Sequence, residues 1–428
     1  MNYALIVFLG MFVLMFVLNL PIGFGMLAAG ASYFLIKGIS LTAVANAVCS
    51  QYWTSYTIIA IPLFIFTSNV MNTGGVTRKL YAFTDAITGR LRGGMAYVNC
   101  IVSLIFAGMT GSAVADASGT GLMELKEMRR QGYPEPFSAA LTGATATVGP
   151  VFPPSITMLM YASVTGASVG RLFMGGIMPA IIMIAGLMTY SAYMAYKHKF
   201  PYGTTYTFYG FIVATFKAIP ALFTVAILLG GIYLGVFTPT EAGAVAGFYA
   251  LLISFFVYKV LGWKDLKTIL VDTIEMVGRV AIAVGCAAVI VYISGLERLP
   301  QVMGGWILGL TDNKYVFLLI VNIMFLVMGC LFDTNTITLV FLPLLLNSLA
   351  AMEIDLVYFG VVFTVNMMIG LLTPPFGSLL FVTSAISECS MGELIKALIP
   401  MILILIASLL LITYVPNLIM YLPGLMKG

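Results

Sequence analysis

Two short segments, GPVFPPS (Gly149–Ser155) and GLLTPPF (Gly370–Phe376), each interrupt a long apolar run. They hold the only two Pro-Pro pairs of the 428-residue chain, and these pairs lie 221 residues apart. Proline has no backbone N–H group and breaks a helix that runs into it. Two apolar helices that are broken at matching points of two halves are typical of secondary transporters, whose solutes bind near the bilayer midplane. The sequence therefore predicts a transport site at these breaks.

The composition is that of a polytopic membrane protein. The chain is 61% hydrophobic and 8% charged, with a mean hydropathy of +1.07, whereas soluble domains carry about 25% charged residues. Met1-Asn2-Tyr3 has no basic region and no cleavage site follows the first apolar run, so we expect a retained helix rather than a signal peptide. The single histidine, His198, and five dispersed cysteines leave no set of residues for a hydrolytic triad or a cysteine–histidine metal site. An enzyme is therefore not expected.

The offset of 221 residues extends beyond the prolines. It also relates Gly108 to Gly329, Gly149 to Gly370, Ser163 to Ser384 and Pro179 to Pro400. Gly108 and Gly329 precede two further polar segments, TGSAVADASG (Thr110–Gly119) and DTNTIT (Asp333–Thr338). An ordered series of matches over more than half of the chain indicates duplication, with a first repeat at 1–205 and a second at 206–428.

Each repeat is predicted to contain the same helical elements in the same order, which makes the fold class all-α. The first has helices at 3–19, 22–37 and 55–73, an interfacial helix at 38–54, a polar-tipped hairpin at 94–127, a broken helix at 137–165 and a closing helix at 172–196. The second has helices at 212–235, 241–260 and 271–296, a hairpin at 315–350, a broken helix at 356–387 and a closing helix at 394–421.

The arms of 94–127 and 315–350 are too short to be two full spans around their polar centres, so we expect re-entrant hairpins. Each repeat then has five spans, and an odd number makes the repeats inverted. With the N-terminus outside, 15 of the 20 Lys and Arg residues fall in cytoplasmic loops, as the positive-inside rule requires. These loops are 74–93, 124–136, 197–217, 259–279 and 388–396. The first hairpin would then lie on the cytoplasmic side and the second on the outer side.

The chemistry is expected at the four breaks. Irregular backbone at membrane depth is tolerated only when it is buried in protein or lines a wet cavity. Carbonyl, hydroxyl, amide and carboxylate oxygens suit a hard cation such as Na⁺, and the positive N-termini of half-helices suit an anionic solute. Asp116 and Asp333 are the ionisable residues of these breaks, and an aspartate at this depth is a candidate functional residue.

Structural roles for the same residues are left open. Asp116 would cap its own hairpin tip, and Asp333 would be the N-cap of a helix that starts near Thr334. Short hydroxyls in membrane helices often bond back to the preceding turn. This alternative applies to the polar residues of the tips and breaks: Ser112, Ser118, Asn335, Thr336, Thr338, Thr145, Thr147, Ser155 and Thr373.

These motifs resemble the large membrane subunit of tripartite ATP-independent periplasmic (TRAP) transporters, over essentially the whole chain. The resemblance is carried by GMTGSAVAD (Gly108–Asp116), GPVFPPS (Gly149–Ser155), DTNT (Asp333–Thr336) and LTPPFG (Leu372–Gly377). The chain is most similar to the sialic-acid branch. The resemblance implies an elevator mechanism, import driven by a Na⁺ gradient, a periplasmic substrate-binding protein as partner, and a separate small four-helix membrane subunit in a bacterial inner membrane. No cofactor is expected besides Na⁺ as coupling ion.

The resemblance also implies roles for individual residues. One Na⁺ site would use Ser112, Asp116, Gly149, Val151 and Pro154, and its symmetric counterpart would use Asn335, Thr336, Gly370 and Thr373. The substrate would face Asp333, Ser155, Thr334, Pro153 and Pro374.

Two alternatives remain for function. A sodium/dicarboxylate-type symporter that works without a binding protein would share the hairpins and broken helices. An ion channel is disfavoured, because nothing in the sequence repeats as a selectivity filter. The breaks contain no arginine, so half-helix ends and hydroxyls, or an arginine from elsewhere, would hold a substrate carboxylate.

Overall fold

The computed structural model describes residues 3–18, 22–54, 57–88, 90–203, 207–309 and 311–426, and these residues are almost entirely helical. The helices of the first part of the chain are α1 (Tyr3–Val17), α2 (Ile22–Ile36), α3 (Thr42–Thr54), α4 (Thr57–Thr73), α5 (Val76–Thr88), α6 (Gly94–Thr110), α7 (Ala113–Asp116), the π-helical turn η1 (Ala117–Gly121), α8 (Leu122–Arg130), α9 (Glu135–Ala146), α10 (Ile156–Thr165) and α11 (Val169–Lys197).

The later part of the chain is also helical. Its elements are α12 (Phe208–Tyr233), α13 (Pro239–Leu252), η2 (Ile253–Val257), α14 (Trp263–Leu296), α15 (Leu299–Leu308), α16 (Lys314–Leu331), α17 (Thr334–Thr336), η3 (Ile337–Phe341), α18 (Leu342–Ala351), α19 (Leu356–Leu372), α20 (Ser378–Ile386), α21 (Met391–Tyr414) and α22 (Asn417–Leu425). No strand is assigned within the described ranges.

Seven helices of the described part are long and apolar enough to cross a membrane, which confirms the predicted class. They are α11, α12, α13 with η2, α14, α16, the continuous run from α17 to α18, and α21. Their mean hydropathies lie between 1.5 and 2.7. Both arms of the predicted second hairpin pass this test of length and composition, so their re-entrant character stays a prediction.

Several predicted cytoplasmic loops contain helix in the structure, and two of them contain long helical segments. The segment 74–93 contains α5, and most of 259–279 is the first half of α14, which starts at Trp263 rather than at residue 271. Arg279 and Glu275 form an ion pair of 3.7 Å inside this helix. Both predictions are wrong, because their charged residues resemble those of a loop, whereas both segments have helical periodicity with charges on one face.

The predicted closing helix at 394–421 is two helices, α21 and α22, which meet at Val415 and Pro416. Proline restricts the residue before it to extended conformations. Val415 accordingly has φ −124° and ψ 76°, and the chain turns there.

Both predicted hairpins have a non-helical tip followed by a π-helical turn. In the first, α6 ends at Thr110 and α7 starts at Ala113; in the second, α16 ends at Leu331 and α17 starts at Thr334. The π-helical turns η1 and η3 begin four and three residues later, at Ala117 and Ile337. Short π-helical segments inside helices are frequent at functional sites.

Both predicted broken helices are interrupted where the sequence places the Pro-Pro pairs. Residues 147–155 separate α9 from α10, and residues 373–377 separate α19 from α20. Each interruption contains a cis Pro-Pro bond, Pro153-Pro154 and Pro374-Pro375.

Buried amides join each hairpin to its broken helix. Asn99 of α6 donates to the hydroxyl of Thr142 on α9 (2.8 Å) and accepts from Thr145 (2.7 Å). Asn366 of α19 donates to the Asn322 carbonyl oxygen on α16 (2.9 Å) and to its side chain (3.0 Å). Such bonds satisfy polar groups that no water reaches, and they fix each hairpin against one broken helix.

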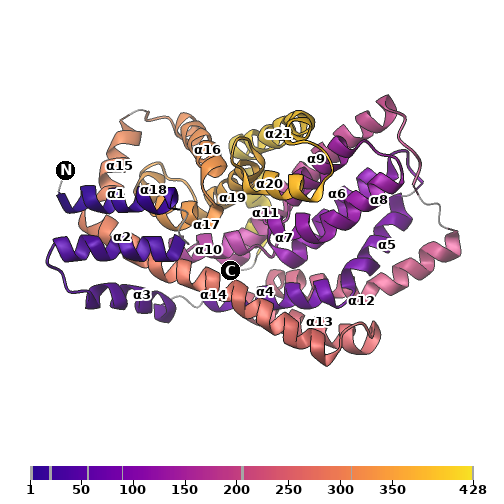
Figure 1. Ribbon diagram of the computed structural model, residues 1–428, viewed down its shortest axis with the longest axis horizontal. Helices are drawn as coiled ribbons and strands as arrows, with labels where there is room; N and C mark the ends of the chain where they lie inside the picture. Colours follow the sequence, from indigo (N-terminus) through magenta and orange to yellow (C-terminus); the bar gives the residue numbers. More distant parts are fainter. Residues whose placement is uncertain are drawn as a thin grey trace.

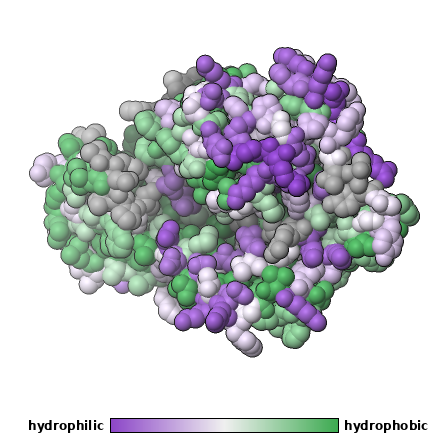
Figure 2. Space-filling model, turned by 45° about the vertical axis from the view of Figure 1, so that its right-hand side comes forward, coloured by the Kyte–Doolittle hydropathy of each residue, from purple (hydrophilic) through white to green (hydrophobic). Residues whose placement is uncertain are grey.

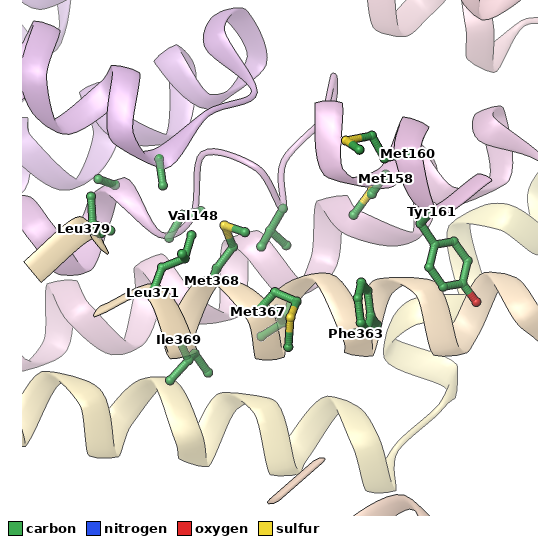
Figure 3. Close-up of a cluster of buried hydrophobic side chains, with 14 of the residues drawn as sticks. Val148, Met158, Met160, Tyr161, Phe363, Met367, Met368, Ile369, Leu371 and Leu379 are labelled. Carbon is green, nitrogen blue, oxygen red and sulfur yellow. The ribbon is translucent and has the colours of Figure 1, made fainter. Parts of the chain in front are cut away.

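The two broken helices pack on each other through apolar side chains, several of which Figure 3 shows between α10 and α19. The rings of Tyr161 and Phe363 lie 5.8 Å apart between centroids. The Tyr161 hydroxyl donates to the Leu356 carbonyl oxygen at 2.8 Å, so the ring is held at both ends. This contact joins the two halves of the chain at their centre.

A second set of helices lies along one side of the molecule. We call α2, α4, α13 and α14 of this set the framework. In Figure 1, α1, α2 and α3 lie side by side, and α14 runs beside them toward α4 and α13. The helix α14 packs against α2, α3 and α4, and α13 packs against α4 and α12. Figure 2, turned by 45° from the view of Figure 1, shows a hollow near the middle of the molecule, with hydrophilic residues on its rim and hydrophobic surface around it.

Candidate functional site

A cavity of about 240 Å³ lies where the tips and breaks meet. Figure 1 places α7, α10 and α17 near the middle of the molecule. The first residues of four helices, Ala113 of α7, Ile156 of α10, Thr334 of α17 and Ser378 of α20, all line this cavity. The other described lining residues are Ile65, Gly111, Ser112, Val114, Pro150, Thr157, Met276, Val280, Asp333, Asn335, Met368 and Leu371.

The first hairpin tip lies directly against the first broken helix. Gly111 has φ +58°, a left-handed conformation that glycine adopts without strain. A Cβ atom at Gly111 would lie 2.8 Å from the Pro154 carbonyl oxygen. The next residue, Ser112, is the N-cap of α7, and its hydroxyl accepts from the Ala115 N–H group at 3.4 Å. A Cβ at Gly149 would be 4.0 Å from the Ser112 carbonyl carbon, so the predicted cluster of Ser112, Gly149 and Pro154 is compact.

The second hairpin tip is organised by Asp333. One carboxylate oxygen accepts from the N–H groups of Asn335 (3.0 Å) and Thr336 (3.3 Å), and the other accepts from the Thr336 hydroxyl. Asp333 is thus an N-cap, as one of the two alternatives predicted, and it also lines the cavity. Among the described lining residues it is the one charged side chain. The buried Thr334 hydroxyl beside it has no hydrogen-bond partner in the described part of the chain.

The breaks present two more helix starts. Ser155 is fully buried and caps α10 by accepting from the Met158 N–H group at 3.1 Å. Gly377 precedes α20 without a side-chain cap, so the first amides of α20 depend on other partners. Gly370 lies against Gly329, with a would-be Cβ only 2.7 Å from the Gly329 Cα atom, which brings the second break against the second hairpin.

The four helix starts give the cavity a positive electrostatic character. A helix N-terminus carries roughly half a positive charge and several unpaired N–H groups. Side-chain caps serve only some of these groups at Ser112, Ser155 and Asp333. The arrangement is suited to an anion, while Asp333 adds a negative charge that a bound cation would compensate.

Asp116 lies outside the cavity lining. It is 1% exposed, and the Thr120 hydroxyl of its own arm donates to its Oδ1 atom at 2.6 Å. The Ser103 side chain of α6 faces the same carboxylate. The second carboxylate oxygen of Asp116, Oδ2, is buried and has no hydrogen-bond partner among the residues that the structure describes. Asp116 does not cap amides of its tip, and its carboxylate lies inside the hairpin instead.

Several predicted hydroxyls bond back to their own helices. The donors and their carbonyl acceptors are Ser118 to Val114 (2.7 Å), Thr147 to Ala144 (2.6 Å), Thr338 to Thr334 (2.7 Å) and Thr373 to Ile369 (2.7 Å). Thr145 bonds both to Leu141 of its helix and to Asn99. The alternative prediction, that these hydroxyls bond back to the preceding helical turn, is confirmed. Each hydroxyl oxygen can still accept a further bond.

The remaining predicted residues flank the cavity without lining it. Pro153 and Pro374 belong to the breaks, whereas Pro150 reaches the cavity. The Val151 carbonyl oxygen lies beside Gly176 of α11, 2.2 Å from where a Cβ of that glycine would be.

Sequence reasoning missed the framework wall of the cavity and one buried acid. Ile65 of α4 and Met276 and Val280 of α14 line the cavity from the framework side, and no sequence signal distinguished them from other apolar residues. Glu124 of α8 is 0% exposed. Its spacing from Asp116 and Thr120, at positions 116, 120 and 124, places the three on one helical side and is a signal that could have found it.

Known proteins match the chain over nearly its whole length. Several relatives are named as TRAP transporter permeases. They include the sialic acid TRAP transporter large permease protein SiaM of Vibrio cholerae, 32% identical over 96% of this chain and 96% of that protein. They also include the C4-dicarboxylate TRAP transporter large permease protein DctM of Pseudomonas aeruginosa, 34% identical over 86% of each chain. Because the two names state different substrates, the family match leaves the substrate of this chain unassigned.

A solved structure has the same fold. The Alcanivorax borkumensis YdaH transporter superposes with a TM-score of 0.65 over 88% of each chain, at 14% sequence identity. The family model described as "Tripartite ATP-independent periplasmic transporter, DctM component" matches residues 9–418. The chain is therefore a member of this family, a multi-pass DctM-type permease of the bacterial inner membrane.

Proposed function

We propose that this permease imports an organic anion by Na⁺ symport, with the anion in the central cavity. The observation that carries the proposal is the convergence of four helix N-termini on one cavity that contains a single described charge, Asp333. Helix N-termini bind carboxylates through free amides and the helix dipole. The unpartnered Thr334 hydroxyl offers a further donor. Sialic acid is the first substrate to test, because SiaM is among the relatives, and a C4-dicarboxylate is the second.

The same site needs a cation for electrostatic balance. An anionic substrate beside the Asp333 carboxylate is repelled by it. Na⁺ ions bound at the two tips would remove this repulsion, which makes binding of ion and substrate mutually favourable. The oxygen atoms around Ser112, Gly149 and Pro154 on one side, and around Asn335, Thr336, Gly370 and Thr373 on the other, support two Na⁺ sites, with Asp116 contributing charge from inside the hairpin.

We further propose that the two halves form an inverted repeat and that transport follows an elevator mechanism. Hairpins and broken helices would move together, because buried amides and the contact between α10 and α19 join them. The framework of α2, α4, α13 and α14 would stay in place. A small membrane subunit and a periplasmic binding protein are the partners that the TRAP family name implies. A symporter that works without a binding protein is the second candidate.

The test is uptake into proteoliposomes that contain this chain and its small subunit. Labelled sialic acid and succinate are supplied with an inward Na⁺ gradient or with K⁺, and with or without the binding protein. We expect Na⁺-dependent uptake of one anion that requires the binding protein. Uptake in K⁺ at the same rate would contradict Na⁺ symport, and full uptake without the binding protein would favour the second candidate.

The variants Asp333→Asn and Asp116→Asn test the charges at constant side-chain shape. Asparagine remains a good N-cap, so Asp333→Asn should keep the thermal stability and lower Na⁺-driven uptake at least tenfold, since roughly 1.4 kcal/mol of lost ion binding suffices for that. Asp116→Asn should also keep the thermal stability and lower Na⁺-driven uptake at least tenfold. Ser118→Ala is the control, because Ser118 is exposed and bonds only to its own helix among the contacts described. Wild-type Na⁺ dependence in both asparagine variants would rule out the proposed sites.

A further inference from the structure

Glu124 is a buried carboxylate that the proposed transport site does not use. It lies on α8, in the second arm of the first hairpin, with 0% of its side chain exposed. Within the described ranges, neither of its carboxylate oxygens has a hydrogen-bond partner. No ion pair found among the described residues includes Glu124 or Asp116. An ionised carboxylate in such a place is costly, and a buried acid usually takes up a proton instead.

A second unpartnered carboxylate oxygen belongs to Asp116, on the same arm. Thr120 lies between the two acids in the sequence of this arm, and its hydroxyl donates to Asp116. Eight residues, about 12 Å of helix, separate the two acids on this arm. In a protein interior two charges at that distance still repel each other, so a charge on one disfavours a charge on the other. A proton on one of the two acids removes this repulsion.

The surroundings of Glu124 favour a proton over a metal cation. Three elements pack against α8, namely α6, α9 and η1. The α6 helix presents the Cys100 thiol, and Asn99 beside it contacts the sulfur atom of Met128 (3.9 Å). The facing part of α9 presents Thr142, which is not titratable, and η1 has no titratable residue. Na⁺ requires several oxygen ligands, whereas sulfur suits softer metals.

We propose that Glu124 is a proton-binding site linked to cation binding at Asp116. When Na⁺ binds at the first hairpin tip, it offsets the charge of Asp116 and favours ionisation of Glu124. The O–H bond of Glu124 then breaks, the electron pair stays on the carboxylate and the proton passes to water. By reciprocity, loss of the proton strengthens Na⁺ binding. The link rests on the proposed Na⁺ site at Asp116, whereas the proton on Glu124 follows from its burial alone.

This linkage fixes the direction in which the Na⁺ affinity changes with pH. Apparent Na⁺ affinity rises with pH over the range in which Glu124 loses its proton, by at most about tenfold per pH unit for one linked proton. Glu124→Gln has the shape of the protonated acid and cannot titrate. It should therefore fold, transport at all pH values, and keep the weak Na⁺ affinity that the wild type has at low pH.

The experiment measures the Na⁺ concentration for half-maximal uptake in proteoliposomes from pH 5.5 to 8.5, for the wild type, Glu124→Gln and Glu127→Gln. Glu127 is the matched control, since it is on the same helix and pairs with exposed Arg130. We expect a pH-dependent value for the wild type and Glu127→Gln and a flat one for Glu124→Gln. The inference is overturned if Glu124→Gln follows the wild type, as a permanently protonated acid would, or if this folded variant loses Na⁺-driven uptake, as a direct Na⁺ ligand would.

A second readout does not depend on transport. Na⁺ is added to the purified complex in weakly buffered detergent solution, with a pH dye and by infrared difference spectroscopy. The wild type should release about one proton and lose the carbonyl band of a protonated acid, and Glu124→Gln should do neither. If Glu124→Gln does not fold, Glu124→Met provides an uncharged side chain of similar length. A wild-type spectrum without a protonated-acid band in the absence of Na⁺ rejects the proton site even if Na⁺ symport is established.

Discussion

Asp333 and Gly111 show how single residues set up the two hairpin tips differently. Asp333 holds the start of α17 with its carboxylate and leaves that charge at the cavity. At the first tip Ser112 makes the cap, and the acid lies four residues further, inside the hairpin. Two tips that match in sequence position therefore differ in where their negative charge lies.

Gly111 should tolerate no side chain. In Gly111→Ala the new Cβ would meet the Pro154 carbonyl oxygen at 2.8 Å, and the φ of +58° costs about 1–2 kcal/mol for an L-residue. We expect a lower melting temperature and loss of uptake, because the tip must move away from the broken helix. Gly119→Ala is the control, since no atom lies within 4 Å of its Cβ position. Equal melting temperatures for the two variants would refute the close contact.

At the scale of elements, the base of the first hairpin is tied to the end of the second broken helix. Arg129 at the end of α8 forms two hydrogen bonds with Glu135 at the start of α9, of 3.0 and 2.6 Å. Its third contact is with Glu388, which follows α20, at 2.6 Å. Arg129 thus bridges elements from both halves of the chain, at the end opposite to the hairpin tip.

Glu135 makes this contact sensitive to pH. The hydrogen bonds from Arg129 lower the pKa of Glu135, against the raising effect of burial. Because the folded-state pKa is depressed, the contribution to stability is complete above the unfolded-chain value of about 4.3 and is lost as the pH falls through the folded-state value. Glu135→Gln should lower the stability by about 1 kcal/mol at pH 7.

The check is thermal unfolding of the wild type, Glu135→Gln and Glu388→Gln in detergent at pH 7 and pH 4. The gap between the wild type and Glu135→Gln should shrink at pH 4. Glu388→Gln should have a smaller effect at both values, since 71% of that side chain is exposed. A gap for Glu135→Gln that is the same at both pH values would show that the carboxylate charge is not what Arg129 stabilises.

At the scale of the whole molecule, the cavity lies between two sets of helices. Val114 and Asp333 belong to the hairpins, and Met276 and Val280 belong to the framework helix α14. If hairpins and broken helices move as one body, cavity residues of the two sets must separate during transport. This movement is what the proposed elevator mechanism requires.

Cross-linking tests this movement. In a background without the five native cysteines, a bifunctional thiol reagent joins the pair Val114→Cys and Val280→Cys. Transport should stop and return after reduction, because the moving part is held to the framework. The pair Ile65→Cys and Met276→Cys lies within the framework, on packed helices, and its cross-link should leave transport intact. Continued transport with the first pair fully cross-linked would contradict an elevator movement.

Much of the architecture follows from the sequence, but which face of each helix lines the cavity does not. The breaks at Pro153-Pro154 and Pro374-Pro375 and the tips at Ser112 and Asp333 are predicted, because each is a polar or proline-containing interruption in apolar sequence. The first half of α14 is not predicted, since its charges resemble those of a loop. The wall residues Met276 and Val280 are not predicted either, because lipid-facing and protein-facing positions of a membrane helix are alike in hydropathy.

The sequence by itself determined the membrane class, the four breaks and the residues at them, because local chemistry decides where a helix starts and ends. Only the tertiary structure decided that the four helix starts share one cavity, that Asp333 faces it, and that Asp116 and Glu124 are buried. Each of these results depends on contacts between segments far apart in the chain. Because the helices are almost uniformly hydrophobic, their sequences do not indicate which face packs against which neighbour.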